Sequence, residues 1–248
     1  MRATTFAFAL LLALAAPAAA QDQDWATYQN NEDGFKIDFP GPPKVTDTIW
    51  ITEQGYTLPA RVYSAEMGGG RYSMTVVDYT VVERLGMERS EHCPIGAETC
   101  QGQPIGQLSR AIGPGYATQE IRAALVYASF KLIQRDAKLK EFLWNWEDLV
   151  EGNEIHLINK ADQSVTMAFV AMKENRLYIM EGTVPKGYPE PGLFFQSIGW
   201  VDKAGNGQRF QLIYVNEVYG LGIYPTPPSG GGGGAGAPPP AAPPAAGR

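Results

Sequence analysis

The sequence predicts an α+β fold, in which helices pack against an antiparallel sheet. Between residues 35 and 184, most segments alternate apolar and polar side chains, which is the pattern of half-buried strands. Short turns rich in glycine or polar residues separate neighbouring segments, and such turns favour hairpins. One long stretch of helical periodicity interrupts the strands after residue 118. The order of strands, helix, strands and a short helix is typical of α+β domains.

The first strands are predicted to form an antiparallel meander. They span residues 35–39, 45–52, 58–66 and 71–82. The first ends at Pro-Gly-Pro-Pro, residues 40–43, because proline cannot donate a hydrogen bond to a strand ladder. The Met-Gly-Gly-Gly segment at 67–70 is expected to connect a hairpin, since glycine tolerates a positive φ without strain.

A helix is predicted from residue 118 to about residue 135. Its apolar face, spaced i, i+4, i+7 and i+11, consists of Ile121, Leu125, Ala128 and Leu132. Strand patterns return at 142–146, 154–159, 165–172 and 176–184, and residues 173–175 are expected to form the turn between the last two. A second, short helix is expected at 190–197.

The chain begins with a predicted secretory signal peptide, residues 1–20. Arg2 precedes an apolar stretch at 6–16, and small residues ending at Ala20 form an A-x-A cleavage site. A membrane anchor is the alternative, but it would require about 20 strongly apolar residues. No later run is long enough to span a bilayer, so we expect no membrane insertion after cleavage. The mature protein is therefore expected to be periplasmic or secreted.

The mature chain is predicted to contain one domain at 21–224, with its core at about 25–202, and a disordered tail at 225–248. The tail is rich in glycine, proline and alanine and cannot bury enough apolar surface to offset the entropy of ordering it. A tether or a proline-rich ligand is the alternative interpretation of the tail. Without Arg2, 19 Lys and Arg face 26 Asp and Glu, which gives a net charge of −7. This acidic balance disfavours nucleic acid as a partner.

The two cysteines, Cys93 and Cys100, are predicted to form a disulfide bond. An even number of cysteines at loop spacing in an exported protein favours this interpretation. The alternative is a metal site of His92 and both cysteines, completed by a nearby glutamate. Zinc sites prefer a shorter Cys spacing with a second ligand pair, and the sequence has none, so we expect no metal and no cofactor.

No catalytic residues are predicted, and the protein is not expected to be an enzyme. His92 and His156 are the only histidines, and no serine lies in a G-x-S-x-G motif. His156 alternates with apolar neighbours in a predicted strand, so we expect it on the solvent face of the sheet. Glu147 and Asp148 are adjacent, and neighbours on one strand point to opposite faces.

Aromatic residues indicate a candidate interaction surface. Trp144 and Trp146 are two residues apart on a predicted strand and therefore share a face, where they would contact a partner. The favoured alternative is that the helix at 118–135 covers this face. Tyr214 and Tyr219 lie in a segment at 210–224 that alternates like a further strand, and tyrosine-rich edges suit interfaces.

Five short segments resemble a group of uncharacterised secreted bacterial proteins that are similar to the PsbP/Mog-type α/β/α sandwich. They are DGFKIDFPGPP at 33–43, LPARVYS at 58–64, YSMTVVDY at 72–79, RLY at 176–178 and FFQS at 194–197. The resemblance spans about residues 25–202. It implies that fold, a periplasmic location, and a role in binding or assembly without catalytic residues. This chain departs from it by adding the Cys93–Cys100 loop and the segment after Trp200.

The functional expectation is a non-catalytic periplasmic accessory or binding module, whose partner is a periplasmic or envelope protein. The alternative is a hydrolase-like enzyme with an acidic site. An exposed aromatic patch on a polar surface would support the first expectation. A concave pocket with two perturbed carboxylates, or His156 beside a serine, would support the second.

Overall fold

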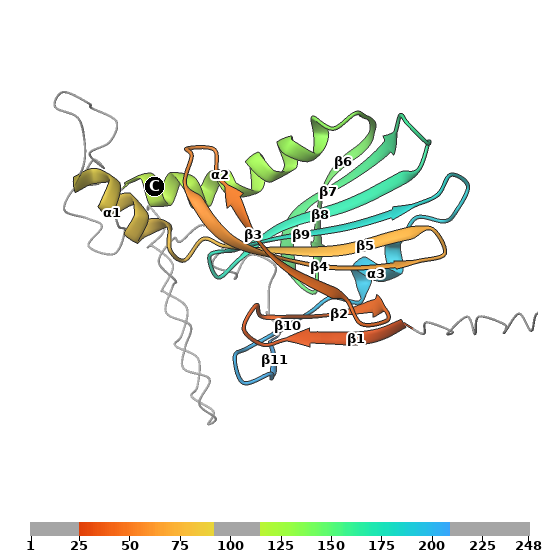
Figure 1. The fold of residues 1–248 in the computed structure, drawn as a ribbon, viewed down its shortest axis with the longest axis horizontal. Coiled ribbons are helices and arrows are strands. Elements are labelled where there is room, and N and C mark those ends of the chain that lie inside the picture. Colours follow the sequence, from red (N-terminus) through yellow and green to blue (C-terminus); the bar gives the residue numbers. More distant parts are fainter. Residues whose placement is uncertain (1–24, 92–114, 209–248) are drawn as a thin grey trace, which may run out of the picture.

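Two antiparallel sheets make up most of the protein. The computed structural model describes residues 25–91 and 115–208. The large sheet has seven strands in the order β3-β4-β5-β9-β8-β7-β6, and the small sheet has four in the order β1-β2-β10-β11 (Figure 1). The strands of the large sheet are β3 (Lys44–Ile51), β4 (Thr57–Met67), β5 (Gly70–Asp78), β6 (Ala137–Glu147), β7 (Val150–Asn159), β8 (Val165–Lys173) and β9 (Arg176–Val184). The strands of the small sheet are β1 (Trp25–Asn30), β2 (Phe35–Pro40), β10 (Gly199–Val201) and β11 (Gly207–Gln208).

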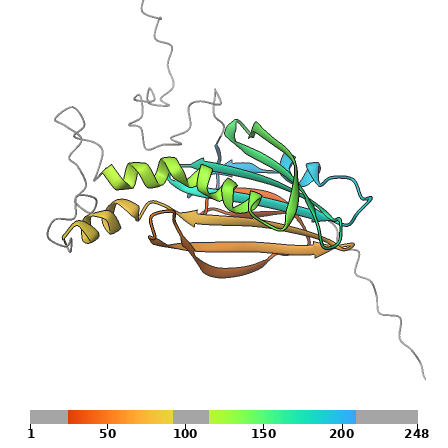
Figure 2. The ribbon, with the colours of Figure 1, turned by 90° about the horizontal axis from the view of Figure 1, so that it is seen from above.

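The two faces of the large sheet are covered by different layers. Helix α2 (Gly115–Ile133) packs on one face against β7, β8 and β9, and helix α1 (Val82–Glu91) lies beside it (Figures 1 and 2). The small sheet and the short helix α3 (Gly192–Gln196) cover the other face (Figure 1). The coarse prediction of an antiparallel sheet with packed helices is confirmed.

Each face has its own hydrophobic core. On the α2 side, Leu125 and Leu132 of the helix pack against buried residues of the sheet such as Ile155 and Leu177. On the other side, the core is aromatic, and Trp200 of β10 meets the ring of Tyr178 at 4.9 Å between centroids. Because both faces of β8 are buried, that strand has a nearly continuous apolar sequence.

The predicted hairpins β4–β5 and β8–β9 are confirmed, and so are the long helix and the short α3. The expectation that the first strand belongs to the meander is wrong, because β2 pairs with β1 and β10 in the small sheet. The strand expected to reach residue 82 ends at Asp78. There the Asp78 carboxylate accepts a hydrogen bond from the Thr80 backbone N–H and starts the turn into α1.

Several predictions fall outside the described residues. These are the signal peptide at 1–20, the Cys93–Cys100 disulfide, the segment with Tyr214 and Tyr219, and the tail at 225–248. Within the described ranges, no helix is long and apolar enough to cross a membrane.

Candidate functional site

Strand β6 presents a row of exposed aromatic side chains at the edge of the large sheet. Phe142, Trp144 and Trp146 are 46%, 50% and 45% exposed, and we call these three residues the β6 aromatic surface. The two indole rings are 5.2 Å apart between centroids. β6 pairs with β7 on one side only, and no other described strand pairs with its outer edge. Among the described strands, the N–H and C=O groups of this edge therefore have no ladder partner beside the aromatic row.

Helix α2 ends its coverage of the sheet one strand before β6. Its Ser129 accepts a hydrogen bond from the Asn153 side chain of β7, at 3.0 Å, and Asn153 is the ladder partner of Trp144. The helix thus reaches β7, while the neighbouring tryptophan on β6 stays half exposed. The two tryptophans do lie on the face that α2 covers, as the favoured expectation had it, but the helix does not reach over them, because the sheet is wider than the helix packed on it.

His156 lies in a buried charged cluster on the opposite face of the sheet. It is 6% exposed, so its expected place on the solvent face is wrong. Its Nε2 lies 2.5 Å from Oε1 of Glu154, and its Nδ1 lies 3.1 Å from Oε2 of Glu190 without hydrogen-bond geometry. The connection between β9 and α3 carries Glu190 and brings this carboxylate over the sheet. The histidine is buried because this connection contributes to the layer covering the second face.

The charged cluster extends along β6. Lys140 donates to Oε1 of Glu190 at 2.7 Å, and this hydrogen bond lowers the pKa of Glu190. The Asn145 amide donates to the second oxygen of Glu154. Burial, with a smaller contribution from the Glu154 charge, raises the pKa of Glu147 to about 7. Lys140, Glu154 and Glu190 were not predicted from the sequence as members of a cluster. The one available signal was that polar residues 154 and 156 alternate with apolar residues in a strand.

This cluster lacks the pairing of a histidine with a serine, threonine or cysteine that activates such a nucleophile. Among the hydrogen bonds of the described residues, none joins His156 to a serine, threonine or cysteine. Glu147 ends β6, whereas Asp148 has a φ of 45° and belongs to the turn, so the two do not share a strand as expected. The Asp148 carboxylate instead accepts from the Trp200 backbone N–H at 3.4 Å. Asp148 thus connects the β6–β7 turn of the large sheet to β10 of the small sheet.

A second charged cluster joins the two sheets around Arg61 of β4. Its guanidinium lies 3.0 Å from the carboxylates of both Asp33 and Asp47, and Tyr63 donates a hydrogen bond to Asp33. Burial, followed by the hydrogen bond to Asp33, raises the pKa of Tyr63. Arg61 is within ion-pair distance of three carboxylates, those of Glu32, Asp33 and Asp47. Because this cation holds the β1–β2 turn against β4, we interpret the cluster as structural.

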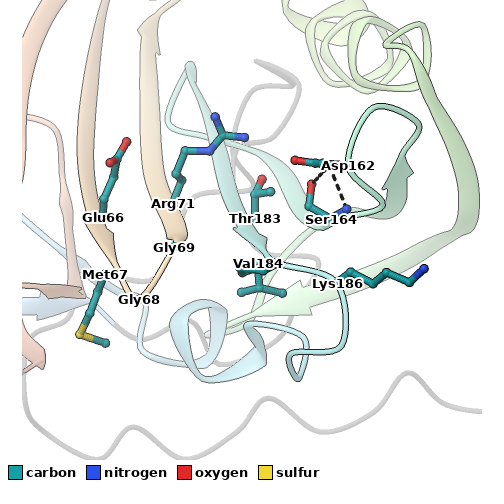
Figure 3. Close-up of a pocket in the computed structure, with 11 residues that line it drawn as sticks. Glu66, Met67, Gly68, Gly69, Arg71, Asp162, Ser164, Thr183, Val184 and Lys186 are labelled. Carbon is teal, nitrogen blue, oxygen red and sulfur yellow. Dashed lines mark hydrogen bonds between the residues drawn. The ribbon is translucent and has the colours of Figure 1, made fainter.

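A polar pocket of about 460 Å³ lies beside the β4–β5 hairpin (Figure 3). Arg71 and Lys186 line it together with Asp162. The Asp162 carboxylate accepts hydrogen bonds from the backbone N–H and the hydroxyl of Ser164, at 2.9 and 2.6 Å, and these bonds lower its pKa (Figure 3). We therefore interpret the Asp162 carboxylate as a group that stabilises the β7–β8 turn through its hydrogen bonds to Ser164.

No family model matches the chain, and no curated protein matches its sequence. Within the described part of the chain, no group of three or more His, Cys, Asp or Glu side chains is arranged to hold a metal ion. The β6 aromatic surface, with three large apolar side chains that are each 45–50% exposed, is therefore the candidate site.

Proposed function

We propose that the mature protein is a non-catalytic accessory or binding module of the bacterial periplasm. Its partner is an extended segment of an envelope protein, which adds to the edge of β6 that no other described strand pairs with. The observation that carries this proposal is the row of half-exposed Phe142, Trp144 and Trp146 along a strand whose outer edge pairs with no other described strand. An added strand would satisfy the backbone groups on that edge of β6, and its alternate side chains would pack on the aromatic rings.

The other edge of the large sheet is a weaker candidate. Strand β3 also exposes apolar residues, including Ile49 at 63% and Ile51 at 51%. These side chains are aliphatic, whereas tryptophan is enriched among residues that contribute most to binding free energy. Strand β3 therefore provides a matched control for β6.

We favour binding over hydrolysis because no hydrogen bond among the described residues joins His156 to a serine, threonine or cysteine. We also propose a distant relationship to the PsbP/Mog-type sandwich. One face of an antiparallel sheet covered by a long helix supports it, although the small sheet on the second face differs from a helical layer.

Photo-crosslinking in intact cells tests the proposal. The bacterium that makes the protein would carry p-benzoylphenylalanine in place of Phe142 or, as the control, in place of Ile49. We expect a discrete adduct with another envelope protein from position 142 at several times the yield from position 49. The double variant Trp144→Ala/Trp146→Ala should reduce that yield without altering the far-ultraviolet circular dichroism spectrum.

Two results would contradict the proposal. Equal yields from both positions would mean that β6 has no special affinity for a partner. An adduct only to residues 209–224 of the same chain would mean that the protein covers its own edge strand.

A further inference from the structure

An apolar cleft of about 550 Å³ lies away from the β6 aromatic surface, between the start of β1 and the region around α3. Four aromatic residues from different elements form much of its wall. They are Trp25 of β1, Tyr72 of β5, Tyr188 of the β9–α3 connection, and Phe194 of α3. Pro191 and Leu193 complete the apolar part. The volume is in the range of pockets that hold small organic molecules.

Two of the four aromatic residues in the wall are buried, and the other two are accessible to solvent. Tyr72 and Phe194 are buried, with their ring centroids 5.4 Å apart. Trp25 packs edge to face on Tyr72, with centroids 4.9 Å apart, but remains 40% exposed. Tyr188 is 58% exposed. Trp25 and Tyr188 therefore offer aromatic surface to a molecule in the cleft.

The charge of the cleft is negative. Asp38 and Glu190 line it, and no lysine, arginine or histidine is among the described residues of its wall. Glu190 is already paired with Lys140 at 2.7 Å. Asp38 accepts a hydrogen bond from the Thr27 hydroxyl at 2.5 Å, but no cationic side chain of the described residues forms an ion pair with it. Asp38 is thus a half-buried carboxylate in the wall of an aromatic cleft, and no described residue neutralises its charge by an ion pair.

We propose that this cleft binds a small organic cation, an alkylated ammonium group attached to a short apolar chain. The negative faces of aromatic rings attract such a cation, and quaternary ammonium groups are commonly recognised in this way. The Asp38 carboxylate adds a direct Coulombic attraction. The apolar chain would lie against Pro191 and Leu193, while the same carboxylates would repel an anionic ligand. The proposal is independent of any partner bound at β6.

Calorimetric titration of the purified mature protein with choline tests the proposal, and 3,3-dimethylbutan-1-ol serves as the comparison. The two molecules have nearly the same shape, but only choline carries a charge. We expect choline to bind at least about tenfold more tightly than the neutral alcohol. Asp38→Asn should weaken choline binding by about tenfold while leaving the affinity for the alcohol unchanged.

Two further variants test whether a loss of choline binding comes from the cleft itself, from a change in the fold or from the change in net charge. Trp25→Ala should also weaken choline binding, and its circular dichroism spectrum would report whether the fold is intact. Asp47→Asn removes the same charge from an exposed side chain outside the cleft and should bind choline like the natural protein. Equal affinity for choline and the alcohol, or equal weakening by the Asp38 and Asp47 variants, would overturn the proposal. An absence of saturable choline binding would overturn it as well.

Discussion

Replacing Glu147 with glutamine should stabilise the protein above pH 7 and have little effect at pH 4. The carboxyl group lies at the end of β6, where burial and, to a smaller extent, the Glu154 charge raise its pKa from an ordinary value of 4.5 to about 7. Between these two pH values, the folded protein retains a proton that the unfolded chain has released. The free energy of unfolding must therefore fall as the pH rises from 4.5 to 7, and the full loss persists above pH 7.

The magnitude follows from the two pKa values. One pKa unit corresponds to about 1.4 kcal/mol, so the difference sets an upper limit of about 3 kcal/mol. Glu147 is partly exposed, and solvent screening reduces this to about 1–2 kcal/mol. Glutamine retains the shape of the side chain but carries no charge, so Glu147→Gln should recover that amount at pH 8. The melting temperature should rise by about 2–4 °C for each kcal/mol.

Urea unfolding of both proteins at pH 4, 6 and 8 measures this effect, provided that the m-value is unchanged. Glu141→Gln is the control, because it removes an exposed carboxylate from the same strand and should show no comparable gain at pH 8. If Glu147→Gln gives the same change in stability at all three pH values, the raised pKa of Glu147 is not the cause. A loss of stability at pH 8 would contradict the reasoning directly.

Three other predictions concern processing and stability. N-terminal sequencing of the exported protein should begin at Gln21, and retention of residues 1–20 would refute the predicted cleavage after Ala20. Replacing Cys93 and Cys100 together with serine should lower the free energy of unfolding by about 2–3 kcal/mol in urea titrations, because the unfolded chain loses a constraint; no change would argue against the disulfide. Gly152→Ala should lower the free energy of unfolding by at least about 2 kcal/mol in the same titrations, since the new Cβ would lie 2.3 Å from a backbone oxygen. Gly207→Ala is the control and should leave the free energy of unfolding nearly unchanged, because no atom lies within 4 Å of its new Cβ.

The local elements follow from the sequence because their causes are local. The hairpin turns at 67–70 and 173–175 connect strands that are neighbours along the chain, so the pairing of β4 with β5 and of β8 with β9 needs no distant information. The helical periodicity of residues 121–132 similarly predicts which face of α2 is buried. Residues 35–39 were also recognised as a strand, but their partners were not. β2 pairs with β10, which lies more than 150 residues away in sequence, and alternation along a strand contains no information about such a partner.

The candidate site depended even more on tertiary structure. Alternation placed Trp144 and Trp146 on one face of a strand and His156 within another, but it does not reveal what covers each face. The tryptophans remain exposed because α2 stops over β7, and His156 is buried because a distant connection carries Glu190 over it. The sequence by itself determined most strands of the large sheet, the long helix and its apolar face, since these depend on short-range periodicity and turn chemistry, whereas β1, α1, β10 and β11 were not predicted. The tertiary structure alone decided which faces are covered and which charges meet, since both depend on contacts between residues far apart in the chain.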